Sequence, residues 1–279
     1  MQASELFNQP NTILLDGGMG TMLQAAGMKL GTRPEDLNIE NPELIRSIHA
    51  KYAAAGSRVV NANTFGASPH KLADSKYTLE EVITAGIANC KQAVAPYGAL
   101  VTLDVGPLGE LLEPSGTLAF EDAVAEYGRI VRAGVAAGAD ILYFETFTDL
   151  YEMKAALLAA KENSTLPIMA SMSFEANGRT FTGCTVESFA ATARGLGANA
   201  VGINCSLGPK EIFPMAKRLA EAVPGDFPVF VKPNAGLPRA DGSGYDITPQ
   251  LYAMQMKPYR ELHLFAAGGC CGTTPEFIK

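Results

Sequence analysis

The stretch Ala200-Val-Gly-Ile-Asn-Cys-Ser-Leu-Gly-Pro209 contains the unit from which we predict the fold. Its apolar run Ala200–Ile203 is typical of a buried strand, Asn204-Cys-Ser of a loop, and the segment from Pro209 of a helix. Similar apolar runs recur along the chain. We predict eight strands: Thr12–Leu15, Arg58–Ala62, Leu100–Leu103, Ile141–Phe144, Ile168–Ser173, Ala200–Ile203, Val229–Lys232 and His263–Ala267.

Between these runs lie alanine-rich segments with apolar residues at three-to-four spacing, which indicates amphipathic helices. They are Pro42–Ala55, Leu79–Ala95, Phe120–Ala137, Leu150–Lys161, Glu187–Leu196, Pro209–Ala222 and Thr248–Arg260. Alternating strands and helices imply a parallel sheet, and eight units imply a closed (β/α)8 TIM barrel of the α/β class. We therefore predict a single domain over residues 1–279, with Asp241-Gly-Ser-Gly as a loop inside it.

The predicted eighth helix has little sequence to form from. The chain stops at Lys279, eight residues after Cys271, where that helix is expected to begin. We therefore expect a barrel that lacks a complete eighth helix. Either the N-terminal segment closes it, or it is one module of a longer polypeptide.

Composition narrows the class of protein. Apolar residues make up 47% of the chain and charged residues 18%, which provides a large core and excludes disorder. The N-terminus lacks a basic start followed by an apolar stretch, and no run approaches the ~20 apolar residues of a membrane span, so we expect a cytoplasmic protein. A net charge of -7 without a Lys/Arg cluster argues against nucleic-acid binding.

Three cysteines follow two of the predicted strands: Cys205 after the sixth, and Cys270 and Cys271 after the eighth. Thiolates suit Zn²⁺, and three protein ligands leave the fourth tetrahedral position open, as in catalytic zinc sites. Neighbouring residues on a strand point to opposite faces, so the pair can share one metal only if the backbone turns. Three glycines would allow this turn: Gly268, Gly269 and Gly272.

Other interpretations of these cysteines stay open. They could be two core thiols with an incidental neighbour, or Cys270 and Cys271 could form a vicinal disulfide. The count of five cysteines is odd and their spacing uneven, which does not suggest a disulfide framework. At a zinc ion with three thiolates, a fourth sulfur would be deprotonated and nucleophilic, which favours alkyl transfer to sulfur.

Polar residues at other strand ends predict an amino-acid site. Asp16 and Glu145 could accept hydrogen bonds from an ammonium group, while the backbone N–H groups of Gly18, Met19 and Gly20 could cradle a carboxylate. Alternatively, Asp16 is a turn or cap residue and Glu145 a buried ion-pair partner.

Two asparagines also end predicted strands. Asn63 and Asn234 could orient substrate, and Asn234 could offer a neutral oxygen to zinc before substrate arrives. The alternative for both is simple hydrogen bonding within a loop.

Together these motifs resemble the homocysteine S-methyltransferase family over about Leu14 to Pro275. The resemblance rests on Asp16-Gly-Gly-Met-Gly-Thr-Met, Asn63-Thr-Phe-Gly-Ala, Gly106-Pro, Glu145-Thr-Phe, Gly202-Ile-Asn-Cys-Ser-Leu-Gly-Pro, Pro233-Asn-Ala-Gly-Leu-Pro and Gly268-Gly-Cys-Cys-Gly-Thr-Thr-Pro. It implies a (β/α)8 barrel whose zinc, bound by Cys205, Cys270 and Cys271, activates homocysteine as a thiolate that accepts a methyl group to become methionine. It also implies that Asp16 and Glu145 bind the amino group and that the glycine loop binds the carboxylate.

Within the family, the chain is most similar to the homocysteine module of cobalamin-dependent methionine synthase. Betaine-dependent members carry a zinc-ligating tyrosine where this chain has Gly66. This difference argues against betaine as the methyl donor. The similarity to the methionine synthase module implies methylcobalamin as donor, with folate-binding and cobalamin-binding modules or subunits as partners. Three alternatives remain: a stand-alone methyltransferase using S-methylmethionine or S-adenosylmethionine, a non-catalytic zinc-binding barrel, and a redox role for the Cys270–Cys271 pair.

Overall fold

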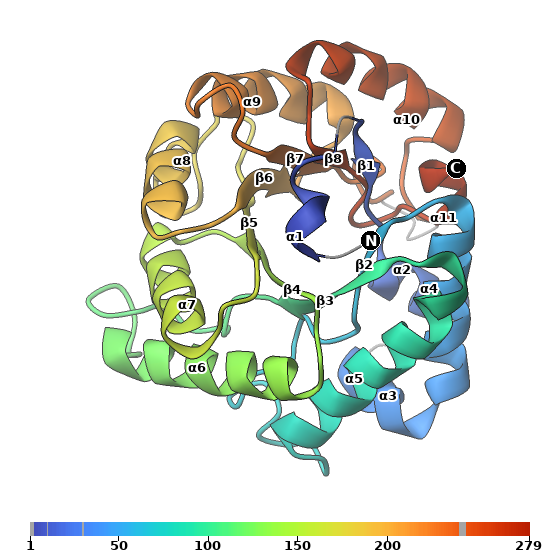
Figure 1. Cartoon of the computed structure of the whole chain (residues 1–279), viewed down its shortest axis with the longest axis vertical. Coiled ribbons are helices and arrows are strands. Elements are labelled where there is room, and N and C mark those ends of the chain that lie inside the picture. The colour runs from blue at the N-terminus through green and yellow to red at the C-terminus, as the bar shows by residue number, and fades with distance from the viewer. Residues whose placement is uncertain (1–2, 10, 30, 240–243) are drawn as a thin grey trace.

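The computed structural model describes residues 3–9, 11–29, 31–239 and 244–279, and it confirms the predicted (β/α)8 barrel (Figure 1). All the neighbouring strands pair in parallel, in the order β1-β8-β7-β6-β5-β4-β3-β2. The barrel closes between its first two strands, where Leu15 bridges Val59 and the Arg58 N–H donates to Leu14 O at 2.8 Å. The strands are β1 Ile13–Leu14, β2 Val59–Asn61, β3 Leu100–Val105, β4 Ile141–Phe147, β5 Ile168–Met172, β6 Ala200–Asn204, β7 Val229–Lys232 and β8 Ala266–Ala267.

Helices surround the strands. The α-helices are α1 Ala3–Leu6, α2 Met19–Ala25, α3 Leu37–Glu40, α4 Pro42–Ala55, α5 Leu79–Val94, α6 Phe120–Ala136, α7 Leu150–Asn163, α8 Val186–Gly195, α9 Pro209–Glu221, α10 Pro249–Met256 and α11 Pro275–Ile278. The described residues also form the short 3-10 helices η1 Pro34–Asp36, η2 Ala95–Tyr97 and η3 Lys257–Leu262. Local sequence explains several boundaries. Thr78 and Glu81, for example, form a capping box at the start of α5.

Many of the predicted strands and helices differ at their ends from those observed, by one to a few residues, and three examples show why. The helix predicted over Thr248–Arg260 ends as an α-helix at Met256 and continues as η3, because Pro258 has no N–H to continue the α-helical bonding. β8 is shorter than the predicted His263–Ala267, since His263 ends η3 with a φ of 47°. β4 runs through Phe147, so Glu145 lies inside the strand rather than after it.

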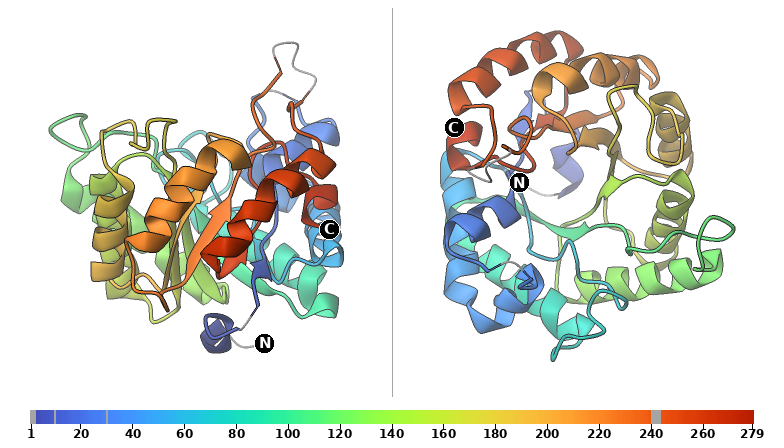
Figure 2. Two further views of the ribbon diagram at one scale, coloured as in Figure 1. Left: turned by 90° about the horizontal axis from the view of Figure 1, so that it is seen from above. Right: turned by 180° about the vertical axis from the view of Figure 1, so that it is seen from behind.

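The first and last helices pack against the barrel. Helix α1 lies over the N-terminal ends of the strands, where Leu6 is buried with the lowest layer of barrel side chains (Figures 1 and 2). After β8, the short helix α11 packs against α4 and α10, and its Ile278 is buried beside Leu23 of α2. Helices α2 and α11 therefore cover the part of the barrel between α10 and α4 (Figure 1).

The interior of the barrel changes from apolar to polar along its axis. At the end covered by α1, side chains such as Ile13, Leu100 and Phe230 form one buried cluster. Further along the same strands, the inward positions become polar and buried, as at Thr102 and Lys232. This change places buried polar groups below the loops that follow the carboxyl ends of the strands, which is where barrel enzymes carry their sites.

Two sequence predictions have limited structural counterparts. Of the predicted loop Asp241-Gly-Ser-Gly, residues 241–243 lie outside the described part of the chain. Within the described ranges, no helix combines the length and the apolar character needed to cross a membrane.

Candidate metal and substrate site

The three predicted cysteine ligands meet at the carboxyl end of the barrel. The Sγ atoms of Cys205, Cys270 and Cys271 all lie within 4.8 Å of one another, and those of Cys205 and Cys271 are 3.7 Å apart. Tetrahedral Zn²⁺ with Zn–S bonds near 2.3 Å places its sulfur ligands about 3.8 Å apart. The cluster therefore fits a zinc ion with small adjustments of the side chains.

Backbone geometry brings the thiols together. Cys205 and Ser206 adopt φ angles of 62° and 61°, a left-handed turn that non-glycine residues adopt only at some cost. Of the three glycines near the pair, Gly272 supplies the left-handed turn, with a φ of 79°. Gly268 and Gly269 are needed for close packing instead: a Cβ at Gly268 would lie 2.7 Å from the backbone oxygen of Asp16.

Hydrogen bonds among the three thiols shift the pKa values of Cys270 and Cys271 in opposite directions. The S–H groups of Cys205 and Cys270 lower the pKa of Cys271 to about 3. The same contacts with Cys205 and Cys271, together with burial, raise the pKa of Cys270 well above its ordinary value. All five cysteines are free thiols, and Cys184 lines a separate pocket beside Asp149.

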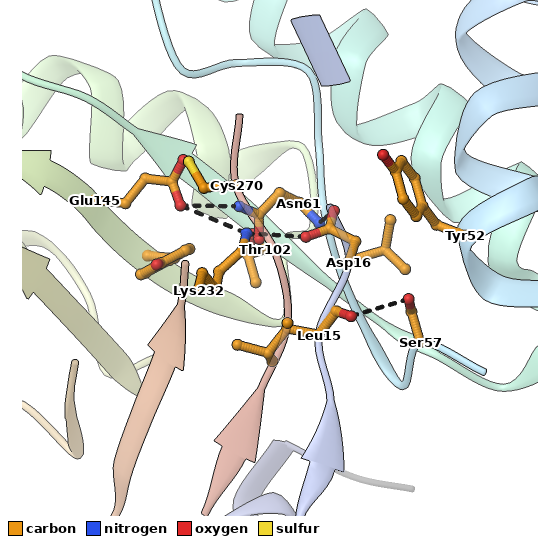
Figure 3. Close-up of polar contacts among 12 residues, drawn as sticks. Leu15, Asp16, Tyr52, Ser57, Asn61, Thr102, Glu145, Lys232 and Cys270 are labelled. Carbon is orange, nitrogen blue, oxygen red and sulfur yellow. Dashed lines mark hydrogen bonds and ion pairs between the residues drawn. The ribbon is translucent and has the colours of Figure 1, made fainter. Parts of the chain in front are cut away.

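Below the thiols, a buried lysine joins the two predicted ammonium-binding carboxylates (Figure 3). Lys232 Nζ lies 3.0 Å from Asp16 Oδ1 and 3.5 Å from Glu145 Oε2. Asp16 Oδ2 accepts a 2.8 Å hydrogen bond from the Asn61 N–H, and Asn61 Nδ2 is 3.5 Å from Glu145 Oε2. Asp16 thus has both oxygens bonded within the protein, and Glu145 is an ion-pair partner of Lys232.

Burial dominates the electrostatics of this group. It raises the pKa of Asp16 and of Glu145, and the positive charge of Lys232 opposes both shifts. The two carboxylates in turn raise the pKa of Lys232 well above its ordinary value, which keeps the amine charged despite the burial. Its ammonium group therefore permanently neutralises part of the negative charge in the barrel.

The predicted carboxylate cradle is the start of α2. The N–H groups of Met19 and Gly20 belong to the first turn of this helix, whose N–H groups have no acceptor within the helix. The Gly18 N–H instead donates to Thr273 Oγ1 at 3.2 Å. The N–H groups of Met19 and Gly20, two of the three predicted donors, therefore lie at the N-terminus of α2.

The two predicted asparagines are held by hydrogen bonds within the protein. Asn63 Nδ2 donates to Pro34 O at 2.7 Å and to Asn38 Oδ1 at 2.9 Å, which ties the loop after β2 to the segment before α4. Asn234 Oδ1 accepts from the Cys271 N–H at 3.0 Å. Asn234 therefore supports a thiol ligand through its backbone, with its oxygen directed to that N–H group.

Sequence reasoning missed several residues of the site. Asn204, at the end of β6, accepts from the Thr146 N–H at 3.0 Å, and its Nδ2 lies 3.9 Å from Cys270 Sγ. Lys232 was placed only at the end of the predicted strand Val229–Lys232, and Asp104 directly after the predicted strand Leu100–Leu103, yet each occupies an inward-facing position. The available signal was a charged residue at the end of the apolar run for Lys232 and directly after it for Asp104.

Apart from Asn204 and Asn234, these groups line one cavity of about 350 Å³. Its walls carry the three thiols, the carboxylates of Asp16, Glu145 and Asp104, and the start of α2. Glu35 also faces it, with Oε1 accepting from the Gly66 N–H at 2.7 Å. The arrangement can hold a soft metal ion at one side and a small molecule with an ammonium and a carboxylate group beside it.

Comparison with known proteins agrees with this geometry. Residues 13–279 match the family described as homocysteine S-methyltransferase. The methionine synthase of Mycobacterium tuberculosis is 30% identical over 285 residues, which cover 95% of this chain and 24% of the relative, so the chain spans about a quarter of that protein.

Solved structures are similar over almost the full chain. The oxidized form of the homocysteine methyltransferase MmuM from Escherichia coli superposes with a TM-score of 0.84 at 25% identity, covering 99% of this chain and 96% of the other. Its metallated form has the same fold, with a TM-score of 0.80 at 24% identity, covering 98% and 96% of the two chains.

Proposed function

Because the chain belongs to the homocysteine S-methyltransferase family, we propose that it transfers a methyl group to the sulfur of homocysteine to form methionine. The observation that carries this proposal is the convergence of Cys205, Cys270 and Cys271 on one wall of a cavity whose other walls carry carboxylates and a helix start. A thiol amino acid has a matching set of groups: sulfur, ammonium and carboxylate.

The three cysteines would hold zinc. When bound, zinc would lower the pKa of a coordinated thiol, so that the substrate sulfur reacts as a thiolate at neutral pH. Asn204 Nδ2 contacts Cys270 Sγ, and Asn234 Oδ1 accepts a hydrogen bond from the Cys271 N–H. These contacts would keep both ligands in position.

The chain's other groups would orient the amino-acid part of homocysteine. Carboxylates inside the barrel would accept hydrogen bonds from its ammonium group, and the N–H groups of Met19 and Gly20 would face its carboxylate. In the transfer, the homocysteine sulfur forms a bond to the methyl carbon while the donor–methyl bond breaks, and that electron pair stays with the donor. Holding the sulfur in place makes this displacement effectively unimolecular.

For the donor, we propose methylcobalamin held by another module, with folate-binding and cobalamin-binding modules or subunits as partners. The support is that the methionine synthase of M. tuberculosis is about four times as long as the region it shares with this chain. We also propose a cytoplasmic location, because a reducing compartment keeps the three thiols available as ligands.

A second candidate is a stand-alone methyltransferase that uses S-methylmethionine or S-adenosylmethionine. It is favoured by the E. coli homocysteine methyltransferase, 96% of which this chain covers. Methionine formation by the isolated protein with either small donor would support this candidate. Methionine formation with methylcobalamin, and with neither small donor, would support the cobalamin-dependent candidate.

The test of the shared proposal is zinc-edge X-ray absorption with and without homocysteine. We expect three sulfur neighbours and one lighter atom at the metal without substrate, and four sulfurs at about 2.3 Å with it. Four ligands that do not respond to homocysteine would overturn the proposal in favour of a non-catalytic zinc-binding barrel. Failure to bind metal, with cycling of Cys270 and Cys271 between dithiol and disulfide, would favour the redox role.

A further inference from the structure

Asp104 is a buried carboxylate that faces the cavity without a hydrogen-bond partner for Oδ1 among the described residues. It shares the inward face of β3 with Leu100 and Thr102, and 6% of its surface is exposed. Its backbone is fixed by Thr64, whose Oγ1 donates to Asp104 O at 2.8 Å. Buried carboxylates normally have hydrogen-bond partners, so the position calls for a donor that arrives with a ligand.

The surrounding charges indicate what kind of donor is missing. Asp104, Asp16 and Glu145 line the same cavity, and Lys232 supplies the cation placed between Asp16 and Glu145. Burial, and then the charge of Glu145, raise the pKa of Asp104 well above its ordinary value. With Glu35, four carboxyl groups line a cavity that holds one ammonium group, and a cationic ligand would supply the missing partner.

Among these acids, Asp104 is the one best placed to receive such a ligand. Glu35 already accepts a hydrogen bond from the Gly66 N–H. Asp16 has one oxygen bonded to Lys232 and the other to the Asn61 N–H. Glu145 Oε2 lies close to both Lys232 and Asn61, and a hydrogen bond from Tyr143 lowers the pKa of Glu145. A cationic group that enters the cavity could therefore bind Asp104 without displacing Lys232 from Asp16 and Glu145.

We infer that Asp104 accepts a hydrogen bond from the α-ammonium group of homocysteine and so selects α-amino thiols over thiols that lack this group. The inference rests on the proposed function and adds a specificity residue that no motif of the sequence marked. Asp16, in turn, acts mainly through Lys232, by holding the cation that shapes the ammonium site.

The experiment compares two thiols that differ only in the amino group: homocysteine and 4-mercaptobutanoic acid. Their binding is followed on the cobalt-substituted protein through the thiolate-to-cobalt absorption band, which requires no methyl donor. The variant D104N keeps the shape of the side chain and removes its charge. We expect it to weaken homocysteine binding by about 10- to 100-fold, the range for a lost hydrogen bond to a charged group, and to change 4-mercaptobutanoate binding less than about 2-fold.

The control variant is Asp74→Asn, which removes an exposed carboxylate on the loop before α5 and should leave both affinities unchanged. Equal losses for both thiols, or no loss for either, would overturn the role of Asp104. A wild-type protein that binds cobalt but neither thiol would instead overturn the proposed function, and the inference with it. Should D104N fail to fold, as judged by circular dichroism and metal content, D104S applies the same comparison with a smaller side chain.

Discussion

Replacing Lys232 by methionine tests whether its ammonium group holds the charged interior of the barrel together. Lys232 is 2% exposed, and its Nζ lies 3.0 Å from Asp16 Oδ1, 3.5 Å from Glu145 Oε2 and 5.4 Å from the centre of the Tyr143 ring. Methionine has a similar length and can fill the same space. The substitution therefore removes the charge and leaves two buried carboxyl groups without their cation.

The expected loss follows from the burial of all three groups. Removing one partner of a buried ion pair costs about 3–5 kcal/mol of unfolding free energy, because the remaining charge stays desolvated. Lys232 has two carboxylate partners, so we expect K232M at pH 8 to lose at least the lower value of this range. At about 2–4 °C per kcal/mol for a chain of this size, the Tm should fall by roughly 6–20 °C.

The pH dependence gives the reasoning a second test. Burial raises the pKa of Asp16 and Glu145, and Lys232 holds these pKa values down. Without Lys232 both pKa values rise further, so the folded variant takes up protons at a higher pH than the unfolded chain does. An acid with a raised folded-state pKa stabilises the fold as the pH decreases, and the penalty of K232M should therefore be smaller at pH 5 than at pH 8.

Urea unfolding at pH 8 and pH 5 measures both quantities. The matched control is Lys217→Met, which breaks an exposed pair with Glu221 at 4.0 Å and should cost less than about 1 kcal/mol. A K232M penalty at pH 8 no larger than that of the control would refute the reasoning. A penalty that grows toward pH 5 would refute the assignment of the protons to the two carboxylates.

Two further variants test the metal ligands and a buried histidine. After dialysis, metal analysis should show that Cys271→Ser has lost most of its bound zinc. Cys184→Ser is the control and should keep its zinc, because Cys184 lies outside the cluster. A full zinc content in Cys271→Ser would contradict the proposed ligand set. Burial lowers the pKa of His49 to about 3, so between pH 7 and pH 5 the unfolded chain gains a proton that the folded state does not, which costs about 2 kcal/mol. His49→Leu removes this pH-dependent cost. From pH 7 to pH 5, the unfolding free energy of His49→Leu relative to the wild type, measured in urea, should therefore rise by about 2 kcal/mol. A difference that does not change with pH would show that His49 titrates alike in the folded and unfolded states.

The barrel and the thiol cluster were predictable from local signals. Each strand or helix is visible as a periodic pattern, and eight alternating units permit few arrangements other than a closed parallel barrel. In that barrel the ends of β6 and β8 face the same mouth, so Cys205 could be placed beside Cys270 and Cys271 without coordinates. The ends of elements were less predictable where they depended on register or backbone geometry, as at Glu145 inside β4 and at Pro258 within η3.

The pairing of charges inside the barrel was decided only by the tertiary structure. Asp16, Glu145 and Lys232 come from the start, the middle and the end of the chain, and their contacts depend on the register between neighbouring strands. No local sequence pattern specifies this register, because it follows from the packing of the whole interior. The sequence by itself determined which chemical groups surround the mouth of the barrel. The closed barrel decided which of them neutralise one another and which, like Oδ1 of Asp104, have no hydrogen-bond partner in the part of the chain that the structure describes.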